Sequence, residues 1–317
     1  MLNFKNIMDL TKFFNTEEKC HQFLKSILWA NGKKCPKCGG CNIQEYKSNF
    51  KKNRCGDCKF DFSIIKGTIF DDSRIQLQKW FMAIYLLNSS KKGVSSVDLA
   101  EKIAVTQKTA WFMLHRLRNS ANTPFFNEPL KNEVEIDEAY LGGKAENKHM
   151  KKRIALKGKH DKAVVLGMVE RGGNVKAIQV ENSQSNTLQT EIYKNVEEGS
   201  TIYTDEHKAY HSISNRYNHK QVNHSVGEYV KVENREKRGD NRTAFKIHTN
   251  TIEGYWGLVK RGVYGIHHWV SKKHLQKYLN SYSFMYNTRY IANNDRFVAF
   301  LESIVGGKLT YNQLIGK

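Results

Sequence analysis

The sequence has no stretch of about eighteen consecutive apolar residues, the length that a membrane-spanning helix needs, so no membrane span is expected. Its first five residues lack the basic-then-apolar layout of a secretory signal peptide. We therefore expect an intracellular, cytoplasmic protein, a setting in which thiols stay reduced and disulfides are rare. Prolines are scarce, three in 317 residues, while Lys and Asn are abundant. This bias indicates an AT-rich coding sequence rather than a structural feature.

Acidic residues are also few relative to basic ones. The 51 Lys and Arg residues face 31 Asp and Glu residues, which leaves a formal net charge of +20. An excess of this size indicates a polyanionic partner and carries no information about the fold. For an intracellular protein, nucleic acid is the leading partner, and we expect the chain to be associated with the nucleoid.

Turn residues and changes in apolar periodicity divide the chain into six segments. Two of the three prolines, Pro124 and Pro129, fall in a polar stretch without periodicity, which we interpret as a linker between domains. The expected segments are a helical lead at 1–33, a cysteine-rich module at 34–63, a helical region at 64–120, the linker at 121–132, a large mixed domain at 133–290 and a C-terminal tail at 291–317.

Periodicity also predicts the elements within these segments. Before the linker, helices are expected at 16–30, 73–88, 96–103 and 107–118. Beyond it, strands are expected at 134–140, 163–170, 174–180, 201–205 and 220–224, with helices near 186–197, 206–213, 249–261 and 272–286. Arg171-Gly172-Gly173 predicts a hairpin between the second and third of these strands. This order predicts a multidomain α/β protein whose largest domain is a mixed sheet flanked by helices.

The cysteine-rich module contains two C-x2-C pairs, Cys35/Cys38 and Cys55/Cys58, separated by sixteen residues. Four thiolates at this spacing predict one tetrahedral, structural Zn²⁺ in a zinc ribbon, with a hairpin between the pairs. Cys41 leaves an alternative open, because Cys38 and Cys41 also form a C-x2-C. We prefer Cys35 and Cys38 because they match the second pair. Cys20 lies on an apolar helix stripe and is expected in the core.

The helices at 96–103 and 107–118 are separated by a short turn, which is typical of a helix-turn-helix. Such pairs bind DNA but also serve as plain scaffolding, so the pattern by itself is weak. If the second helix enters a major groove, its polar residues contact phosphates and base edges. The residues expected to face outward are Gln107, Lys108, His115, Arg116 and Arg118.

Three acidic residues in different local settings form the candidate catalytic site. Asp137 lies in an apolar run that reads as a buried strand, and Asp205 ends a second such run. Glu253 lies in the opening turn of a predicted helix, where the helix macrodipole favours a carboxylate. Hard cations select oxygen ligands from several elements, so the three acids together predict a site for two divalent metal ions.

The chain resembles the bacterial insertion-sequence DDE transposases that place a zinc ribbon before an RNase H-like catalytic domain. The matching residues are the ribbon from Cys35 to Cys58 and three blocks: IDEAYLGGK at 136–144, YTDEHKAY at 203–210 and HTNTIEGYWGLVKRG at 248–262. The resemblance covers residues 35 to about 290. It implies that Asp137, Asp205 and Glu253 bind Mg²⁺ or Mn²⁺ and that Lys260, seven residues after the last acid, is the accompanying basic residue.

The resemblance further implies a transposase that binds the ends of an insertion sequence in double-stranded DNA and catalyses cleavage and strand transfer. We expect it to assemble on DNA as a homo-oligomer. A catalytically inactive, domesticated DNA-binding regulator is the alternative, and the presence of all three acids and Lys260 argues against it. A nuclease that cuts without joining strands also stays open.

Further basic residues are candidates for DNA contact. They are Lys151, Lys152 and Arg153 in a basic stretch at 144–162, together with Lys260 and Arg261. Glu135, Glu138 and Glu206 neighbour the three acids and are left out of the predicted site. His248 either supports the site or is an ordinary residue before a helix. Three aromatic residues are expected to pack rather than to stack on bases: Tyr255, Trp256 and Trp269.

Overall fold

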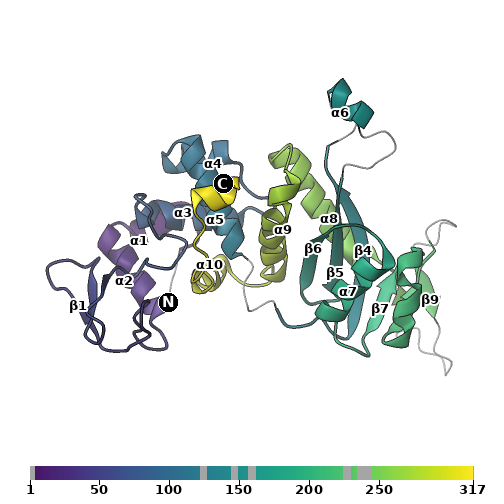
Figure 1. Cartoon of the computed structure of the whole chain (residues 1–317), viewed down its shortest axis with the longest axis horizontal. Coiled ribbons are helices and arrows are strands. Elements are labelled where there is room, and N and C mark those ends of the chain that lie inside the picture. The colour runs from purple at the N-terminus through teal and green to yellow at the C-terminus, as the bar shows by residue number, and fades with distance from the viewer. Residues whose placement is uncertain are drawn as a thin grey trace. The chain divides into compact units, whose positions relative to one another are not determined.

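The computed structural model describes residues 4–121, 127–143, 149–155, 162–223, 230–233 and 245–316. The chain divides into two compact units (Figure 1). The first consists of Met1–Thr123 together with Thr288–Lys317, and the second is Pro124–Asn287. No helix of the described residues is long and apolar enough to cross a membrane.

The first unit combines helices with a small sheet. Its helices are α1 (Ile7–Phe13), α2 (Glu17–Leu28), α3 (Leu77–Ser89), α4 (Ser96–Ile103), α5 (Gln107–Ser120), α10 (Asn293–Glu302) and α11 (Tyr311–Ile315). The four helices predicted here are confirmed to within four residues at each end. Side-chain caps fix five helix starts in this unit, since Asn6, Thr16, Ser95, Thr106 and Thr310 each accept the backbone N–H of the third helical residue.

The small sheet belongs to the cysteine-rich module. Its strands are β1 (Ile43–Glu45), β2 (Asn53–Cys55) and β3 (Asp61–Phe62), and both neighbouring pairs are antiparallel. Ile43 pairs with Cys55, so the predicted hairpin between the two C-x2-C pairs is confirmed.

The segment 291–317, expected to be a tail, instead contains α10 and α11 and belongs to the first unit. Phe297, Phe300 and Leu301 of α10 lie at i, i+3 and i+4 and are fully buried. The Phe297 ring lies 5.4 Å from the ring of Phe4 and 5.5 Å from that of Phe81, measured between centroids. The end of the chain therefore completes the core of the first unit.

The outward orientation expected for His115, Arg116 and Arg118 of α5 is wrong, because all three are buried. Arg116 is only 4% exposed, and its guanidinium donates hydrogen bonds to the carbonyl oxygens of Ile69, Asp71 and Leu309. These backbone acceptors replace water as its hydrogen-bond partners, so the cation is stably buried. Arg116 therefore fixes loops within the unit and is not available to DNA.

The second unit contains the large sheet. Its strands are β4 (Glu133–Leu141), β5 (Ala163–Glu170), β6 (Val175–Val180), β7 (Thr201–Thr204), β8 (Asn218–Gln221), β9 (Lys231–Glu233) and β10 (Phe245–Ile247). Its helices are α6 (Met150–Ala155), α7 (Ser185–Asn195), the 3-10 helix η3 (Lys208–Asn215), α8 (Asn250–Arg261), the π-helix η6 (Gly262–Ile266) and α9 (Lys272–Asn287).

Five of these strands form one sheet in the order β6-β5-β4-β7-β8. β4 pairs with β5 and β5 with β6 in antiparallel fashion, whereas β4 pairs with β7 and β7 with β8 in parallel. The predicted hairpin at Arg171-Gly172-Gly173 is confirmed. The predicted mixed sheet flanked by helices is confirmed as well, and its topology agrees with an RNase H-like domain.

Helices cover both faces of this sheet (Figure 1). Alternate side chains of β4 point to opposite faces and pack against different helices. Ala139 and Leu141 share a buried cluster with α8 and α9, whereas Val134 and Ile136 share one with α7 and η3. On the α8 face, a Cβ at Gly167 would overlap the indole ring of Trp256, so this close helix–sheet contact needs glycine. α8 is thereby held directly against the middle strands.

Candidate active site

The three predicted acids lie on three elements that meet on the α8 side of the sheet. Glu135 of β4 pairs with Tyr203 of β7, and the same register carried two residues further puts Asp137 beside Asp205. Neighbouring strands are about 4.8 Å apart, so the two carboxylates are close neighbours. Glu253 lies in the first turn of α8 and accepts a hydrogen bond of 3.2 Å from the Thr249 hydroxyl.

Burial and the negative charges of Asp205 and Glu253 affect the pKa of Asp137. Burial raises the pKa of Asp137 to about 6, with further contributions from the negative charges of Asp205 and Glu253. The indole N–H of Trp256 acts in the opposite direction. A carboxyl group whose pKa is raised by like charges favours a nearby cation, because the cation removes that repulsion.

A fourth carboxylate, Glu138, directly follows Asp137 on β4, and it was left out of the predicted site. Strand alternation turns it to the opposite face, toward Tyr210 and His207 of the η3 region. Burial raises its pKa to about 7, and the charges of Asp205 and Asp137 contribute. Its Oε1 atom is buried, and the His207 Nδ1 atom lies 3.7 Å away.

The crowded carboxylates of Asp137, Asp205 and Glu253 fit a divalent cation, which takes oxygen ligands. The carboxylates are not drawn tightly together. Within the described part of the chain, the cysteine cluster is the one group of three or more potential metal ligands whose ligand atoms all lie within 4.8 Å of one another. Asp137, Asp205 and Glu253 therefore stand as neighbours whose side chains are further apart than in a closed metal site.

Glu135, also left out of the predicted site, fixes the start of α8. It lies two residues before Asp137 on the same face of β4 and is completely buried. Its carboxylate accepts the backbone N–H groups of Thr251 at 2.8 Å and Ile252 at 3.1 Å, and the Thr251 hydroxyl at 2.9 Å. The N-cap residue Thr249 makes no side-chain cap. Glu135 thus caps α8 from β4, and it fixes the helix that carries Glu253 against the strand that carries Asp137.

Arg171 neutralises this buried carboxylate. Its Nε atom lies 2.8 Å from Glu135 Oε1, and its terminal nitrogens donate to the carbonyl oxygens of Lys246 and His248. The guanidinium also lies over the Tyr203 ring, 3.9 Å from its centroid. His248 Nδ1 approaches Glu135 Oε1 to 3.2 Å, so this histidine belongs to the support of the site. The hairpin, β4 and the segment before α8 are joined by one network.

Removing Glu135 should therefore be costly. We expect Glu135→Ala to lower the free energy of unfolding by about 3–5 kcal/mol, because Arg171 and two helix N–H groups lose their buried partner. Urea unfolding followed by circular dichroism measures the change. Glu181→Ala removes an exposed acid and should stay within about 0.5 kcal/mol. Equal effects of the two substitutions would show that the Glu135 network does not support the fold.

The four predicted cysteines form the cluster in the first unit. Cys35 Sγ lies 3.7 Å from Cys58 Sγ, and Cys38 Sγ lies 3.6 Å from Cys55 Sγ. Four sulfurs bound tetrahedrally to zinc at about 2.3 Å are separated by about 3.8 Å, so the arrangement fits a structural Zn²⁺. Cys41 is exposed and outside the cluster, which confirms the preferred pairing. Burial raises the pKa of Cys20 to about 12, as expected for a core thiol.

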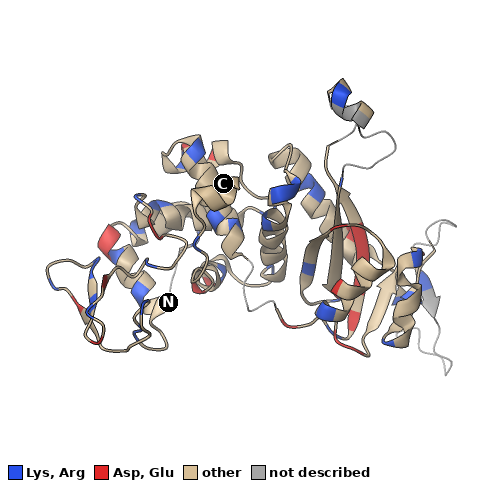
Figure 2. Cartoon of the chain, in the orientation of Figure 1, with Lys and Arg blue, Asp and Glu red and all other residues tan. Residues whose placement is uncertain are grey.

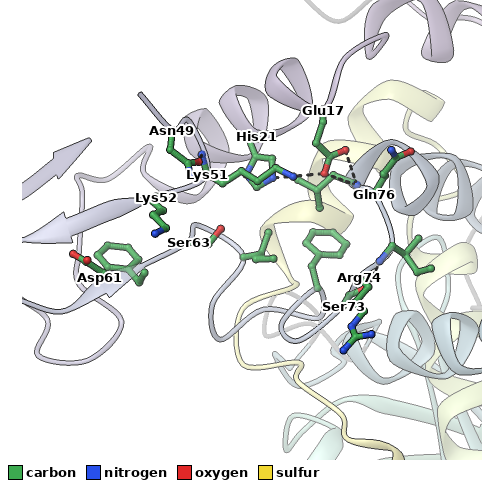
Figure 3. Close-up of a pocket in the computed structure, with 15 residues that line it drawn as sticks. Glu17, His21, Asn49, Lys51, Lys52, Asp61, Ser63, Ser73, Arg74 and Gln76 are labelled. Carbon is green, nitrogen blue, oxygen red and sulfur yellow. Dashed lines mark hydrogen bonds and ion pairs between the residues drawn. The ribbon is translucent and has the colours of Figure 1, made fainter. Parts of the chain in front are cut away.

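A pocket of about 540 Å³ lies where the ribbon meets α2 and the segment before α3 (Figure 3). Both oxygens of Glu17 accept the Leu77 N–H at 3.0 Å, and His21 Nε2 lies 3.7 Å from Glu17 Oε1. Glu17 thus joins α2 to the start of α3. Three basic residues line the same pocket: Lys51, Lys52 and Arg74.

Most of the other residues predicted to contact DNA are at the surface. Gln107 and Lys108 are exposed in the first turn of α5, and Lys260 and Arg261 are exposed in the last turn of α8. In the second unit, acidic residues gather on the strands and basic residues on the helices (Figure 2). Lys151 is exposed in α6, whereas the side chains of Lys152 and Arg153 lie outside the described set.

The three aromatic residues expected to pack do not behave alike. Tyr255 and Trp256 are buried, which confirms that expectation for both. For Trp269 it is wrong, because this side chain is 66% exposed.

Comparison with known proteins gives matches to both units. The family described as ISXO2-like transposase domain matches residues 129–287, the part that carries the carboxylates. The family described as transposase zinc-ribbon domain matches residues 15–60, the part that carries the cysteine cluster. The chain is also 28% identical over 285 residues to an uncharacterized protein in transposable element ISH50 of Halobacterium salinarum. That match covers 86% of this chain and 91% of the relative.

Proposed function

The chain belongs to the ISXO2-like transposase family, and from this membership we propose that it is an active DDE transposase. It binds the ends of an insertion sequence, cleaves phosphodiester bonds there and transfers the freed strands to target DNA, acting as a homo-oligomer on paired ends. The observation that carries the proposal is that Asp137 lies on β4, Asp205 directly follows the neighbouring strand β7, and Glu253 lies on the helix packed against the sheet.

Asp137, Asp205 and Glu253 are the residues that would hold the metal ions, and Glu138 adds negative charge beside them. When bound, two Mg²⁺ or Mn²⁺ ions activate a water or a terminal 3′-OH and stabilise the leaving oxygen of an in-line displacement. The protein keeps its carboxylates in place through rigid elements. β4 carries Asp137, and the Glu135 cap and the buried Trp256 hold the Glu253 helix on the sheet.

Lys260 positions DNA in this scheme. It lies seven residues after Glu253, two turns of α8, and therefore about 10 Å further along the same face. At that distance it contacts a DNA phosphate next to the reacting one rather than a metal ion. Arg261 follows it at the exposed end of the helix.

The first test is activity. The purified chain is incubated with Mg²⁺ and labelled DNA that carries the inverted repeats flanking its coding sequence. We expect strands cut at the repeat ends and products joined to a second DNA. Binding of the repeats without cutting, under either Mg²⁺ or Mn²⁺, would contradict an active transposase.

Contacts between basic side chains and DNA phosphates predict that the affinity for DNA depends strongly on salt concentration. Log affinity should fall linearly with log salt concentration, by roughly 0.9 per neutralised phosphate. Replacing Lys151, Lys152 and Arg153 together by Ala should reduce that slope by about two to three. Fluorescence anisotropy with a labelled repeat, measured over a range of salt concentrations, gives both slopes.

A charge-preserving variant is the matched control for this prediction. Lys151→Arg, Lys152→Arg and Arg153→Lys combined keep all three cations and should leave the slope at the wild-type value. If the alanine variant also keeps the wild-type slope, these residues are solvated and do not contact phosphates.

A further inference from the structure

A second pocket, of about 360 Å³, lies in the catalytic unit beyond the acids. Leu141, Val263 and Leu275 give it an apolar floor. Other lining residues carry aromatic, imidazole or ammonium groups: Tyr264, His268, Trp269 and Lys272. A small apolar pocket with a few polar groups at its edge is the usual form of a ligand site.

Trp269 is held at this pocket by a tight turn. Its backbone N–H donates to the carbonyl of His267 at 2.6 Å, so His268 is the centre of a γ-turn with a φ of +57°. Turns of this kind are rare and strained, and strained backbone is concentrated at functional sites. The neighbouring His267 ring is fixed against Tyr278, with 4.8 Å between centroids. The turn therefore presents a large, mostly exposed indole from a fixed support.

Tyr264 of η6 forms another wall of the pocket. The π-helix η6 follows α8 directly, and π-helical turns are frequent at functional sites. The Tyr264 hydroxyl of η6 accepts the Gly142 N–H at 3.4 Å and donates to the Gly142 carbonyl at 3.3 Å. Trp269 approaches the next residue, since a Cβ at Gly143 would lie 4.0 Å from the indole Cδ1 atom. The indole therefore lies close to the glycine pair that ends β4.

The pocket is aligned with the reacting centre. α8 runs beside β4 in the same direction, because Thr251 contacts Glu135, Trp256 packs on Gly167, the β5 partner of Asp137, and Tyr264 contacts Gly142. Five residues separate Asp137 from Gly142, about 16 Å at the rise of an extended strand. One strand of DNA advances about 3.4 Å per nucleotide, so the distance corresponds to about five nucleotides. Exposed cations lie at both ends of the segment that carries the pocket: Lys260 and Arg261 in the last turn of α8, and Lys272 and Lys273 in the first turn of α9.

We propose that this pocket, which we name the Trp269 pocket, receives an unpaired nucleobase of the DNA strand within about five nucleotides of the reacting phosphate. The base stacks on the Trp269 indole, and its backbone phosphates lie along the basic residues of α8 and α9. Every base has an aromatic face, so such stacking needs no particular sequence. The inference rests on the proposed function, because it places DNA at the carboxylates.

The test compares DNA ends with and without an unpaired base. Labelled repeat duplexes carry 2-aminopurine, paired or in a single-base mismatch, at each of the five positions next to the cleaved phosphate. At one or two positions the wild-type protein should bind the mismatched duplex more tightly, with stacking quenching the 2-aminopurine fluorescence. Trp269→Ala should lose about 5- to 100-fold of the affinity for that duplex. Trp269→Phe should keep most of the affinity.

Tyr290→Ala, which removes an exposed aromatic ring of the first unit, is the matched control and should bind both duplexes as the wild type does. If the wild type cuts DNA and Trp269→Ala binds and quenches equally well, the Trp269 pocket does not take a base, although the proposed function stands. If the wild type neither binds nor cuts repeat DNA, the proposed function itself fails. If Trp269→Ala changes only self-association in analytical ultracentrifugation, the pocket is a contact between copies of the chain and the inference is overturned.

Discussion

Asp137→Asn, Asp205→Asn and Glu253→Gln should each reduce cleavage and joining of element-end DNA by about a thousandfold or more while leaving DNA binding largely intact. Each substitution keeps the size of the side chain and removes one negative charge from a site that has to hold two dications. Residues that act as a unit show grossly non-additive losses, so the triple variant should be little worse than any single one. Initial rates in Mg²⁺, compared with anisotropy binding curves, separate chemistry from affinity.

Two further variants test whether the loss of activity is specific to the three acids. Glu206→Gln removes an exposed acid directly after Asp205 and should keep close to wild-type rates. Lys260→Ala should be milder than the loss of any of the three acids, because it removes a phosphate contact and no metal ligand. If Glu206→Gln is the inactive variant and Glu253→Gln is not, the third acid has been wrongly assigned.

Loss of the structural zinc should have the second large effect. Cys55→Ser should bind about one zinc ion fewer per chain and unfold residues 34–63. Zinc binding contributes on the order of 10 kcal/mol in small zinc modules, more than a segment of this size gains from its own core. In this ribbon Cys55 also forms the end of β2, so its loss affects the sheet and the metal site together. Atomic absorption on purified protein measures the zinc, and amide hydrogen exchange reports the folding of the segment.

Cys41→Ser is the matched control, since Cys41 lies three residues after Cys38 but outside the sulfur cluster. It should retain zinc and protection from exchange. A wild-type protein that is folded in this region without zinc would contradict a structural role for the metal.

The parts of the site that could be predicted are those encoded in local sequence. Asp137 and Asp205 each stand in or directly after an apolar strand, and Glu253 opens an amphipathic helix. The support of the site could not be predicted in this way. Glu135 caps a helix that begins 115 residues later in the chain (Glu135 to Asn250), and Arg171 reaches it from a hairpin. Only the tertiary fold brings these groups together. Period-two alternation does place Glu135 on the same face of the strand as Asp137, so this part of the support could be predicted from the sequence.

The wrong expectations share a physical cause, because residue type does not reveal burial. Arg116 carries a charge and yet is buried, since three backbone carbonyls of distant loops accept its N–H groups. Trp269 is large and apolar and yet exposed, since a strained turn at His268 directs it outward. Phe297 belongs to a short helix, α10, whose apolar side chains are buried only because the helix packs into the core of the first unit.

A strand-transfer assay with a labelled element end, run on wild-type and Glu253→Gln protein, tests the role of the three acids most directly. Reactions contain Mg²⁺, Mn²⁺ or EDTA. The wild type should cut and join strands with either metal and lose both activities in EDTA, while Glu253→Gln should bind the end and produce neither product. Joining by Glu253→Gln at the wild-type rate, or by the wild type in EDTA, would contradict metal-dependent catalysis by Asp137, Asp205 and Glu253.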